Sequence, residues 1–205
     1  MSQATINEET ICKFIPSDSH PNYFIDVGVG LKSEYVTLSK HYPNMRLVGL
    51  EPCPITFKNL ITKFDGLLLP YAVWEKKTNL DLYFSKTSLD SASVFAVGRD
   101  ENVKVHAVTL DSIDQQLGYP DRILLWIDVE GSELMALRGA QKLLESGRVS
   151  WINLAVRNKW SRGIEACTKE EIDTFLNQFG YKEKLQYNHH NRKSEFWRCD
   201  AIYVR

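Results

Sequence analysis

The chain has 205 residues, of which 43% are hydrophobic and 25% are charged, and its formal net charge at pH 7 is −1. These values are typical of one globular domain with a sizeable core. They exclude a strongly charged surface that would attract nucleic acid or an anionic membrane. No apolar run approaches the roughly 20 residues of a membrane-spanning helix.

The N-terminus and the cysteines indicate the compartment. Residues 1–10 lack the basic start and the apolar stretch of a secretory signal. The four cysteines lie far apart, without metal-binding spacing: Cys12, Cys53, Cys167 and Cys199. We therefore expect free thiols, a cytoplasmic location, and neither a nucleic-acid nor a membrane partner. Nothing in the sequence indicates an oligomeric state.

Residues 1–22 are expected to form an irregular or partly helical lead-in, followed by one domain at residues 23–205. Short apolar runs predict strands, in chain order, at residues 23–27, 46–50, 67–73, 80–84, 103–110, 123–127, 151–156, 181–187 and 196–204. Within the third of these, Pro70 favours an edge position or a bend. The Ser-rich residues 86–100 are expected to form a surface loop.

Helices are expected between most of these strands. Capping residues and apolar spacing predict them from Ser33 to about His41, from Pro54 onward, at 111–118 with Asp111 as the cap, at 132–145, and from Thr168 to Gly180. Alternation of strands and helices predicts a mostly parallel sheet with helices on both faces and a ligand site at the carboxyl ends of the strands. The last two strands are expected to form an antiparallel hairpin, whereas a nicotinamide-binding domain usually ends in parallel strands.

The stretch DVGVG follows the first predicted strand. Gly28 and Gly30 allow a tight turn on which a nucleotide-like ligand can rest. Ser33 stands where a full dinucleotide fingerprint needs its third glycine, so a plain tight turn explains this stretch equally well. Glu51 strengthens the ligand interpretation, because an acid at the end of the second strand can accept both hydroxyls of a ribose.

Three acids follow the buried strand at 123–127. Its carboxyl end is expected beside the first strand, at the point where ligand crevices form. Asp128 leaves the strand before the turn at Gly131, which favours an active-site role, and Glu130 fits either an active-site or a structural role. Glu133 falls in the first turn of a helix, where the macrodipole stabilises an acid by roughly 0.3–1 kcal/mol.

Four motifs together resemble the FkbM-type S-adenosylmethionine (SAM)-dependent methyltransferases: FIDVGVG, GLEPCP, TLDSI and LLWIDVEGSELMALRGAQKLL. The resemblance runs from about Tyr23 to Val204. It implies a Rossmann-like class I methyltransferase fold, with a mostly parallel seven-stranded sheet that ends in an antiparallel hairpin. It also implies SAM as methyl donor and O-methylation of a hydroxyl on a sugar, a glycan or a small natural product.

The resemblance further implies the roles of individual residues. Those expected to bind the cofactor are Asp26, Gly28, Gly30, Glu51, Pro52, Ala72 and Asp128. Asp128 and Glu130 are expected near the acceptor as bases or metal ligands. Ser91 and Ser93, in the predicted loop over the crevice, and Glu133 are the candidate acceptor contacts. A divalent metal is not favoured, because two or three carboxylates supply few of the oxygen ligands that such an ion needs.

Three positions depart from the family pattern. Gly30 stands where the family commonly has Asn, Lys32 stands near the last Gly of the family's first loop, and Ala155 stands where members often carry an acid. These departures leave open a non-catalytic SAM-binding scaffold. A nicotinamide-dependent oxidoreductase is a further alternative, which Ser33 and the final hairpin disfavour.

Overall fold

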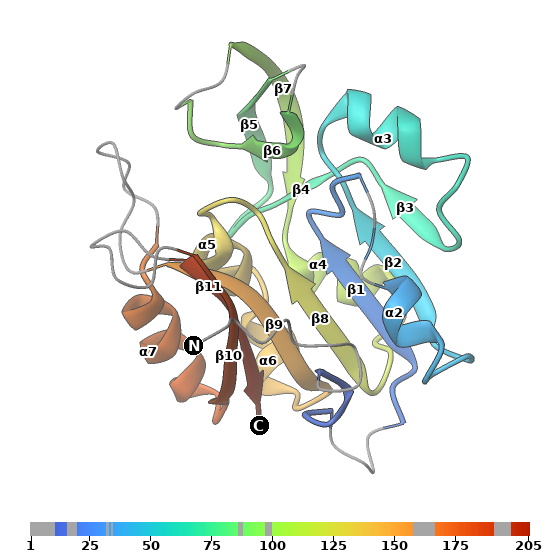
Figure 1. The fold of residues 1–205 in the computed structure, drawn as a ribbon, viewed down its shortest axis with the longest axis vertical. Helices are drawn as coiled ribbons and strands as arrows, with labels where there is room; N and C mark the ends of the chain where they lie inside the picture. Colours follow the sequence, from blue (N-terminus) through green and yellow to red (C-terminus); the bar gives the residue numbers. More distant parts are fainter. Residues whose placement is uncertain are drawn as a thin grey trace.

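The computed structural model describes residues 11–15, 20–31, 33, 35–85, 88–96, 100–157, 167–190 and 198–205. These residues form a large sheet with helices on both faces and a smaller sheet that extends from one edge (Figure 1). Among them, no helix is both long and apolar enough to cross a membrane. None of the four cysteines, all of which lie in these ranges, forms a disulfide.

The large sheet has seven strands in the order β10-β11-β9-β8-β1-β2-β3. Their bounds are β1 Tyr23–Val27, β2 Arg46–Leu50, β3 Leu67–Leu69, β8 Ile123–Ile127, β9 Val149–Arg157, β10 Lys182–His190 and β11 Arg198–Val204. Every pair is parallel except those that β11 makes with β9 and β10. The predicted fold class, including the antiparallel final hairpin, is therefore confirmed.

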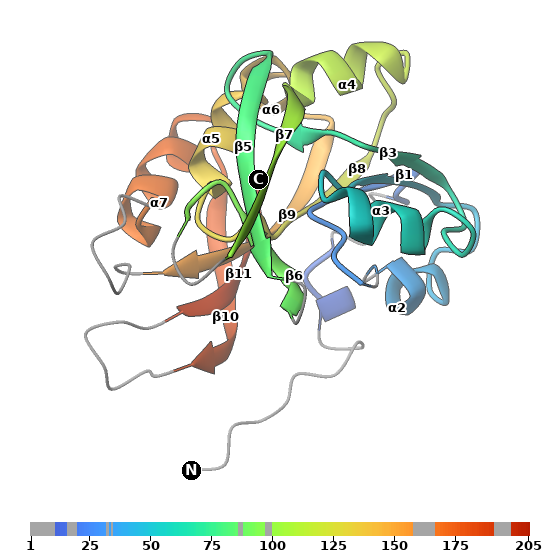
Figure 2. The same ribbon diagram turned by 90° about the horizontal axis from the view of Figure 1, so that it is seen from above.

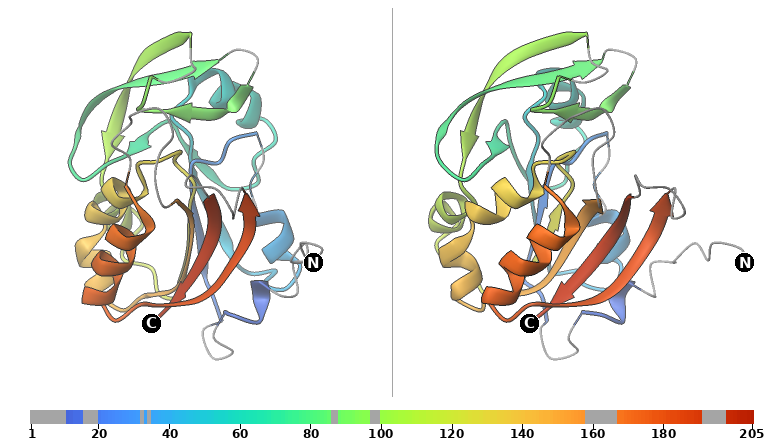
Figure 3. Two further views of the ribbon diagram at one scale, coloured as in Figure 1. Left: turned by 60° about the vertical axis from the view of Figure 1, so that its left-hand side comes forward. Right: turned by 90° about the vertical axis from the view of Figure 1, so that its left-hand side faces the viewer.

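The central strands are buried on both faces, as their continuous apolar runs predict. On one face, Ile25 and Leu125 join the core cluster that the helices α4 to α7 cover. On the other face, Phe24 and Leu124 pack with Ile11, in the lead-in, and with α2. Figures 2 and 3 show α7 and α2 on opposite sides of the sheet.

The helices are short. They are α2 Tyr35–Ser39, α3 Pro54–Leu60, α4 Leu110–Gln116, α5 Glu133–Arg138, α6 Gln141–Glu145 and α7 Lys169–Gln178. The predicted capping box of α7 is confirmed: Thr168 and Glu171 each bond the other's backbone N–H.

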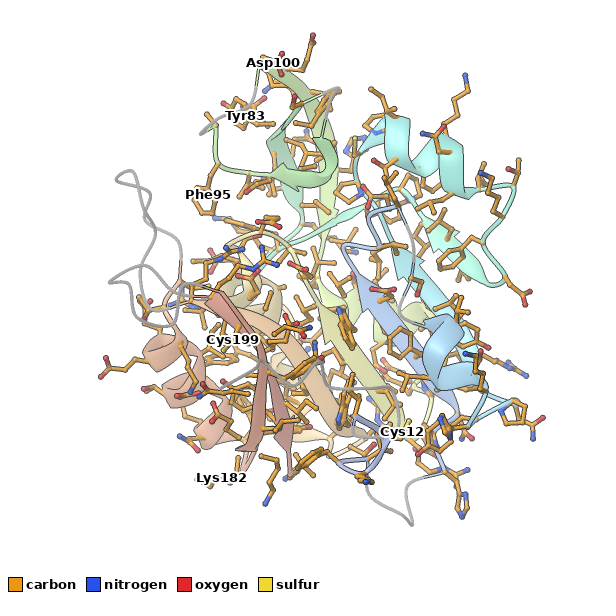
Figure 4. All side chains as sticks on the ribbon, in the orientation of Figure 1. Cys12, Tyr83, Phe95, Asp100, Lys182 and Cys199 are labelled. Atoms are coloured by element: carbon orange, nitrogen blue, oxygen red, sulfur yellow. The ribbon has the colours of Figure 1, made fainter. Side chains whose placement is uncertain are left out.

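The small sheet was not predicted. It has the order β4-β7-β5-β6, with β4 Ala72–Val73, β5 Thr78–Ser85, β6 Ser88–Ser93 and β7 Glu101–Val108. It stands above the carboxyl ends of the large sheet (Figure 3). Tyr83 and Asp100 lie at its far end, whereas Phe95 lies nearer to the large sheet (Figure 4). We call β5, β6 and β7 together the arm.

The small sheet corrects one loop prediction and one strand prediction. The prediction of a loop at 86–100 is wrong in part, because Ser88–Ser93 pair with β5 as the strand β6. The run at 67–73 is not one strand: it breaks at Pro70 into β3, at the edge of the large sheet, and β4, in the small sheet. Proline has no N–H to continue a ladder, which explains the break.

Two helix predictions are also corrected. The helix expected at 132–145 divides into α5 and α6 at Gly139, where an added Cβ would lie 2.2 Å from the carbonyl oxygen of Trp74. Asp111 does not cap α4; Thr109 does, by accepting from the N–H of Ser112. The carboxylate of Asp111 instead accepts from the N–H groups of Lys142 and Leu143, at 3.2 and 2.9 Å.

The ion pair between Asp114 and Arg148 is expected to stabilise the end of the sheet opposite the arm. Asp114 in α4 is buried, and both of its oxygens accept from the Arg148 guanidinium at 2.6 Å. Asp114→Asn should lower the free energy of unfolding by about 3 kcal/mol, because one partner of a buried pair is removed. Urea denaturation measures this change.

Asp81→Asn is the matched control. Asp81 pairs with Lys104 at 3.0 Å, but both side chains are exposed, so we expect a loss of less than about 1 kcal/mol. Equal losses in the two variants would contradict the stabilising role of the Asp114 pair.

Candidate active site

The turn after β1 touches the residue that leaves β8. Gly28 and Gly30 have φ values of 84° and 64°, which glycine adopts without strain. A Cβ at Gly28 would lie 2.1 Å from the carbonyl oxygen of Asp128. Gly28 is therefore required both for the turn and for the close approach of the two strand ends.

Glu51 follows β2 and lies against the same turn. It is 4% exposed, and its two carboxylate oxygens accept from the N–H groups of Gly30 and Cys53 at 2.9 and 2.8 Å. These bonds fix the orientation of the carboxylate. A carboxylate oxygen can accept more than one hydrogen bond, so Glu51 has the chemistry to receive the hydroxyls of a ribose.

Asp26, the next-to-last residue of β1, is also buried. Its Oδ2 accepts a hydrogen bond from the hydroxyl of Ser33, and the Ser33 oxygen accepts from the N–H of Tyr35 at 3.1 Å. Ser33, which replaces the third glycine of a dinucleotide fingerprint, thus connects Asp26 to the start of α2.

The three acids that the sequence singles out follow β8: Asp128 and Glu130 lie in the turn, and Glu133 is the first residue of α5. Glu130 and Gly131 have φ values of 49° and 105°, so the chain reverses through the left-handed region. Beneath the turn, Glu133 Oε1 accepts from the N–H of Gly131 at 3.0 Å, and the thiol of Cys167 lies 3.5 Å from Glu133 Oε2. Glu133 thereby holds a backbone conformation that is unfavourable for Glu130.

Asp128 is half-buried, and one of its two carboxyl oxygens is enclosed without a partner in the part of the chain that the structure describes. Its Oδ1 is buried and has no hydrogen-bond partner among the described residues. Burial raises the pKa of Asp128 to about 7, with smaller contributions in the same direction from the negative charges of Glu130 and Glu133. A carboxyl group with this pKa can accept a proton near neutral pH.

The other two acids have different surroundings. Glu130 lies between two cations, with Arg157 Nη2 3.0 Å from its Oε2 and Arg198 Nη1 3.9 Å from its Oε1. Glu133 is 1% exposed, and burial raises its pKa. Burial also raises the pKa of the neighbouring Cys167 thiol to about 12, so this cysteine is a packing residue and not a nucleophile.

Two cavities open on either side of the contact between Gly28 and Asp128. The first lies beneath the arm; its lining includes Gly28, Gly30, Glu51, Pro52, Tyr71, Ala72, Ser93, Asp128 and Glu130. The second lies beside the final hairpin and is lined by Asp26, Gly28, Val29, Trp126, Asp128, Asn188, Arg198 and Asp200. Gly28 and Asp128 are common to both cavities.

The structure thus brings together most of the residues that the sequence predicts for the site. Asp26 lines the second cavity only, together with Gly28 and Asp128. Ser93 lines the first cavity, and its hydroxyl donates to the carbonyl of Glu130 at 2.9 Å. Ser91 belongs to β6, and its side chain lies outside the described residues. Glu133 lies beneath the turn and lines neither cavity.

Several lining residues were not predicted. Tyr71, Asn188, Arg198 and Asp200 lie outside the four quoted motifs, and Trp126 lies within one but was not assigned to the site. The order of the strands brings these residues to one edge. The predicted hairpin was the one available signal for the last three. Across the ranges that the structure describes, no group of three or more His, Cys, Asp or Glu side chains is arranged to hold a metal ion.

Comparison with known proteins agrees with the family resemblance of the sequence motifs. A family model described as the methyltransferase FkbM domain matches residues 26–183. No curated protein matches the sequence.

The fold resembles fibrillarin of Aeropyrum pernix with bound SAM, at a TM-score of 0.53 and 14% identity over 95% of this chain and 72% of that one. It also resembles a putative rRNA methylase of Clostridium thermocellum (TM-score 0.53, 11% identity, 97% and 93% coverage). A third neighbour is the N-terminal domain of EvdMO1 in the presence of SAH and D-fucose (TM-score 0.51, 10% identity, 97% and 81% coverage).

Gly28→Ala should distort the contact between the two strand ends. The new methyl group would overlap the Asp128 carbonyl, and overpacking of this kind costs about 1–3 kcal/mol beyond the cost of a positive φ. We expect a lower melting temperature and weaker binding of any ligand that spans the turn, measured by thermal denaturation and calorimetric titration with S-adenosylhomocysteine (SAH).

Gly118→Ala is the control, because Gly118 has a similar φ of 77° but no atom within 4 Å of an added Cβ. It should lose about 1–2 kcal/mol through φ alone and keep its ligand affinity. Identical behaviour of the two variants would show that the close approach at Gly28 is unimportant.

Proposed function

Because the chain belongs to the FkbM family of methyltransferases, we propose that it transfers a methyl group from SAM to a hydroxyl oxygen of a sugar or a small natural product. The observation that carries this proposal is Asp128: a half-buried residue whose carboxyl oxygen Oδ1 is buried and unpartnered among the described residues, at the wall that two cavities share. A hydroxyl acceptor must lose a proton during transfer, and Asp128 lies where a donor in one cavity and an acceptor in the other would meet.

The first cavity suits the adenosine part of the donor. Glu51 is oriented by two backbone N–H groups to receive the ribose hydroxyls, and Pro52 and Ala72 give the cavity an apolar wall. Gly28 and Gly30 leave the backbone open to close approach, and Asp26, beyond the turn, offers a negative charge toward the methionine end. When bound, SAM supplies an electrophilic methyl group on a positively charged sulfur.

Asp128 is the proposed general base. Its raised pKa makes the ionised form a better proton acceptor than an ordinary aspartate, and ionisation near pH 7 keeps enough of that form present. Glu130 lies near the acceptor in this proposal, but two arginines engage its carboxylate. Its role is to hold the Arg198 guanidinium at the wall of the second cavity.

The EvdMO1 neighbour supports beginning the search for an acceptor among sugars, because SAH and D-fucose were present with that domain. The role of Ser93 follows from its bond to the Glu130 carbonyl: it fixes the arm to the acidic turn and so closes the first cavity around the donor.

Donor binding is tested by calorimetric titration with SAH, with NAD in parallel. We expect one-to-one binding of SAH and no binding of NAD. Glu51→Ala should weaken SAH binding about tenfold or more, because a hydrogen bond to a charged group contributes roughly 1.5–3 kcal/mol. Glu51→Asp retains the charge but shortens the side chain, so its SAH affinity should lie between those of the wild type and Glu51→Ala.

A thermal melt of each variant controls for misfolding. Unchanged SAH affinity in a folded Glu51→Ala protein would remove Glu51 from the donor site. Binding of NAD in place of SAH would overturn the proposed function.

Asp128→Asn should keep SAH binding and lose methyl transfer, by about 10²-fold or more, because a positioned base contributes that much. Transfer is measured with radiolabelled SAM and a panel of monosaccharide glycosides. In the wild type, kcat/KM should rise with pH through about 7 as Asp128 loses its proton, and the residual rate of the variant should lack this rise. Full activity in Asp128→Asn would exclude Asp128 as the base.

A further inference from the structure

The far wall of the second cavity is built by the last two strands of the chain. Asn188 of β10 and Arg198 and Asp200 of β11 line it, opposite Gly28 and Asp128. Figure 1 shows this hairpin at the edge of the large sheet, on the opposite side of β1 from β2 and β3. The adenosine part of the donor is assigned to the β2 side, so the hairpin faces the side from which an acceptor would approach.

An irregularity in the hairpin directs Asn188 toward β11. Tyr187 pairs with Asp200 and His190 pairs with Arg198, so the register shifts between these two pairs. Asn188 lies within the shift and has a φ of 52°. Its amide donates to Asp200 Oδ2 at 2.7 Å. Bulges of this kind reorient side chains next to active sites, and here the bulge joins an amide and a carboxylate on the cavity wall.

Arg198 adds hydrogen-bond donors to this wall. Its Nη1 lies 3.9 Å from Glu130 Oε1, and its side chain is 41% exposed. A guanidinium has five N–H donors, and one long ion pair leaves donors for a ligand. On the neighbouring strand, Ala155, which pairs with Asp200 in the register of β9 and β11, has a small side chain that carries no charge.

Trp126 gives the cavity an aromatic surface. Its ring is held between those of Phe24 and Trp151, at centroid distances of 6.5 and 6.0 Å, and it remains partly exposed. An aromatic surface beside carboxylate, amide and guanidinium groups matches a sugar, which has an apolar ring face and a rim of hydroxyls. The buried, unpartnered Oδ1 of Asp128 on the same cavity is an independent sign of a missing polar partner.

The charges limit the acceptor further. Three carboxylates line the cavity, on Asp26, Asp128 and Asp200, and they repel an anion. Arg198 and the positive sulfur of the donor repel a cation. A neutral compound with several hydroxyls satisfies both conditions.

We propose that the second cavity binds the methyl acceptor as a neutral polyhydroxy compound, and that Asn188, Arg198 and Asp200 recognise the hydroxyls next to the one that is methylated. This inference rests on the proposed function. It assigns recognition to a wall that no sequence motif marks. The three residues are expected to bind the acceptor without taking part in proton transfer.

Saturation-transfer NMR on the SAH-saturated full chain tests the inference. The probes are D-fucose, which is neutral, and D-glucuronate, which is an anion. We expect binding of D-fucose and little or none of D-glucuronate. Asp200→Asn and Arg198→Gln should each weaken D-fucose binding about tenfold, because each removes hydrogen bonds to a charged group. Their affinity for SAH, measured by calorimetry, should not change.

Asp121→Asn is the matched control. Asp121 is exposed beside the start of β8, at the opposite end of the strand from Asp128, and its substitution should change neither affinity. Thermal melts identify any variant that fails to fold, and two variants of different chemistry keep the test valid if one is lost.

The outcomes separate this inference from the proposed function. Unchanged D-fucose binding in both folded hairpin variants would overturn the inference and leave the methyltransferase function intact, as would preference for a charged probe or no binding of any probe. Loss of SAH affinity in the hairpin variants would also overturn it, because the cavity would then belong to the methionine end of the donor. Failure of the wild type to bind SAH would overturn the proposed function itself.

Discussion

The site depends on the contact between the turn after β1 and the backbone of Asp128. The two central strands are in parallel register, with Val27 opposite Ile127, and the N–H of Asp128 bonds the carbonyl of Val27 at 3.0 Å. The next residue of the first strand must then pass against the Asp128 carbonyl, and only glycine fits there. This contact divides the carboxyl edge into two cavities and places one carboxyl group on the wall between them.

The three acids after β8 carry the same charge but are stabilised in three ways. Glu133 is held by a backbone N–H and lies beside a thiol. Glu130 is paired with arginines from β9 and β11. Asp128 keeps a buried oxygen without a partner among the described residues. A buried carboxylate without a partner is costly, and such a cost is typical of a functional group. Glu133 and Glu130 are held by these partners, and Asp128 is the acid to which we assign the proposed role in proton transfer.

The sequence predicted the features that depend on local pattern. Continuous apolar runs identified β1 and β8, and glycines and acids at their ends marked the site. Within the arm, β5 and β7 were predicted as strands, whereas β6 was missed because it is rich in serine and forms only by pairing with β5. The break at Gly139 was missed because its cause, the carbonyl of Trp74, is distant in the sequence. Asn188, Arg198 and Asp200 were missed for the same reason: their position follows from the pairing of β11 with β9, which no local motif encodes.

The order of the strands also bears on Ala155, where the missing acid left open a non-catalytic SAM-binding scaffold. In the register of the sheet, Asp200 of β11 lies directly opposite Ala155 of β9. A carboxylate therefore reaches this edge from the neighbouring strand, and the small side chain of Ala155 carries no charge. The loss of an acid from one strand does not remove acidic character from the cavity. In the proposed arrangement, β1 and β2 build the donor side and the final hairpin builds the acceptor side, so the acceptor wall can change without altering the contact at Gly28 that supports both.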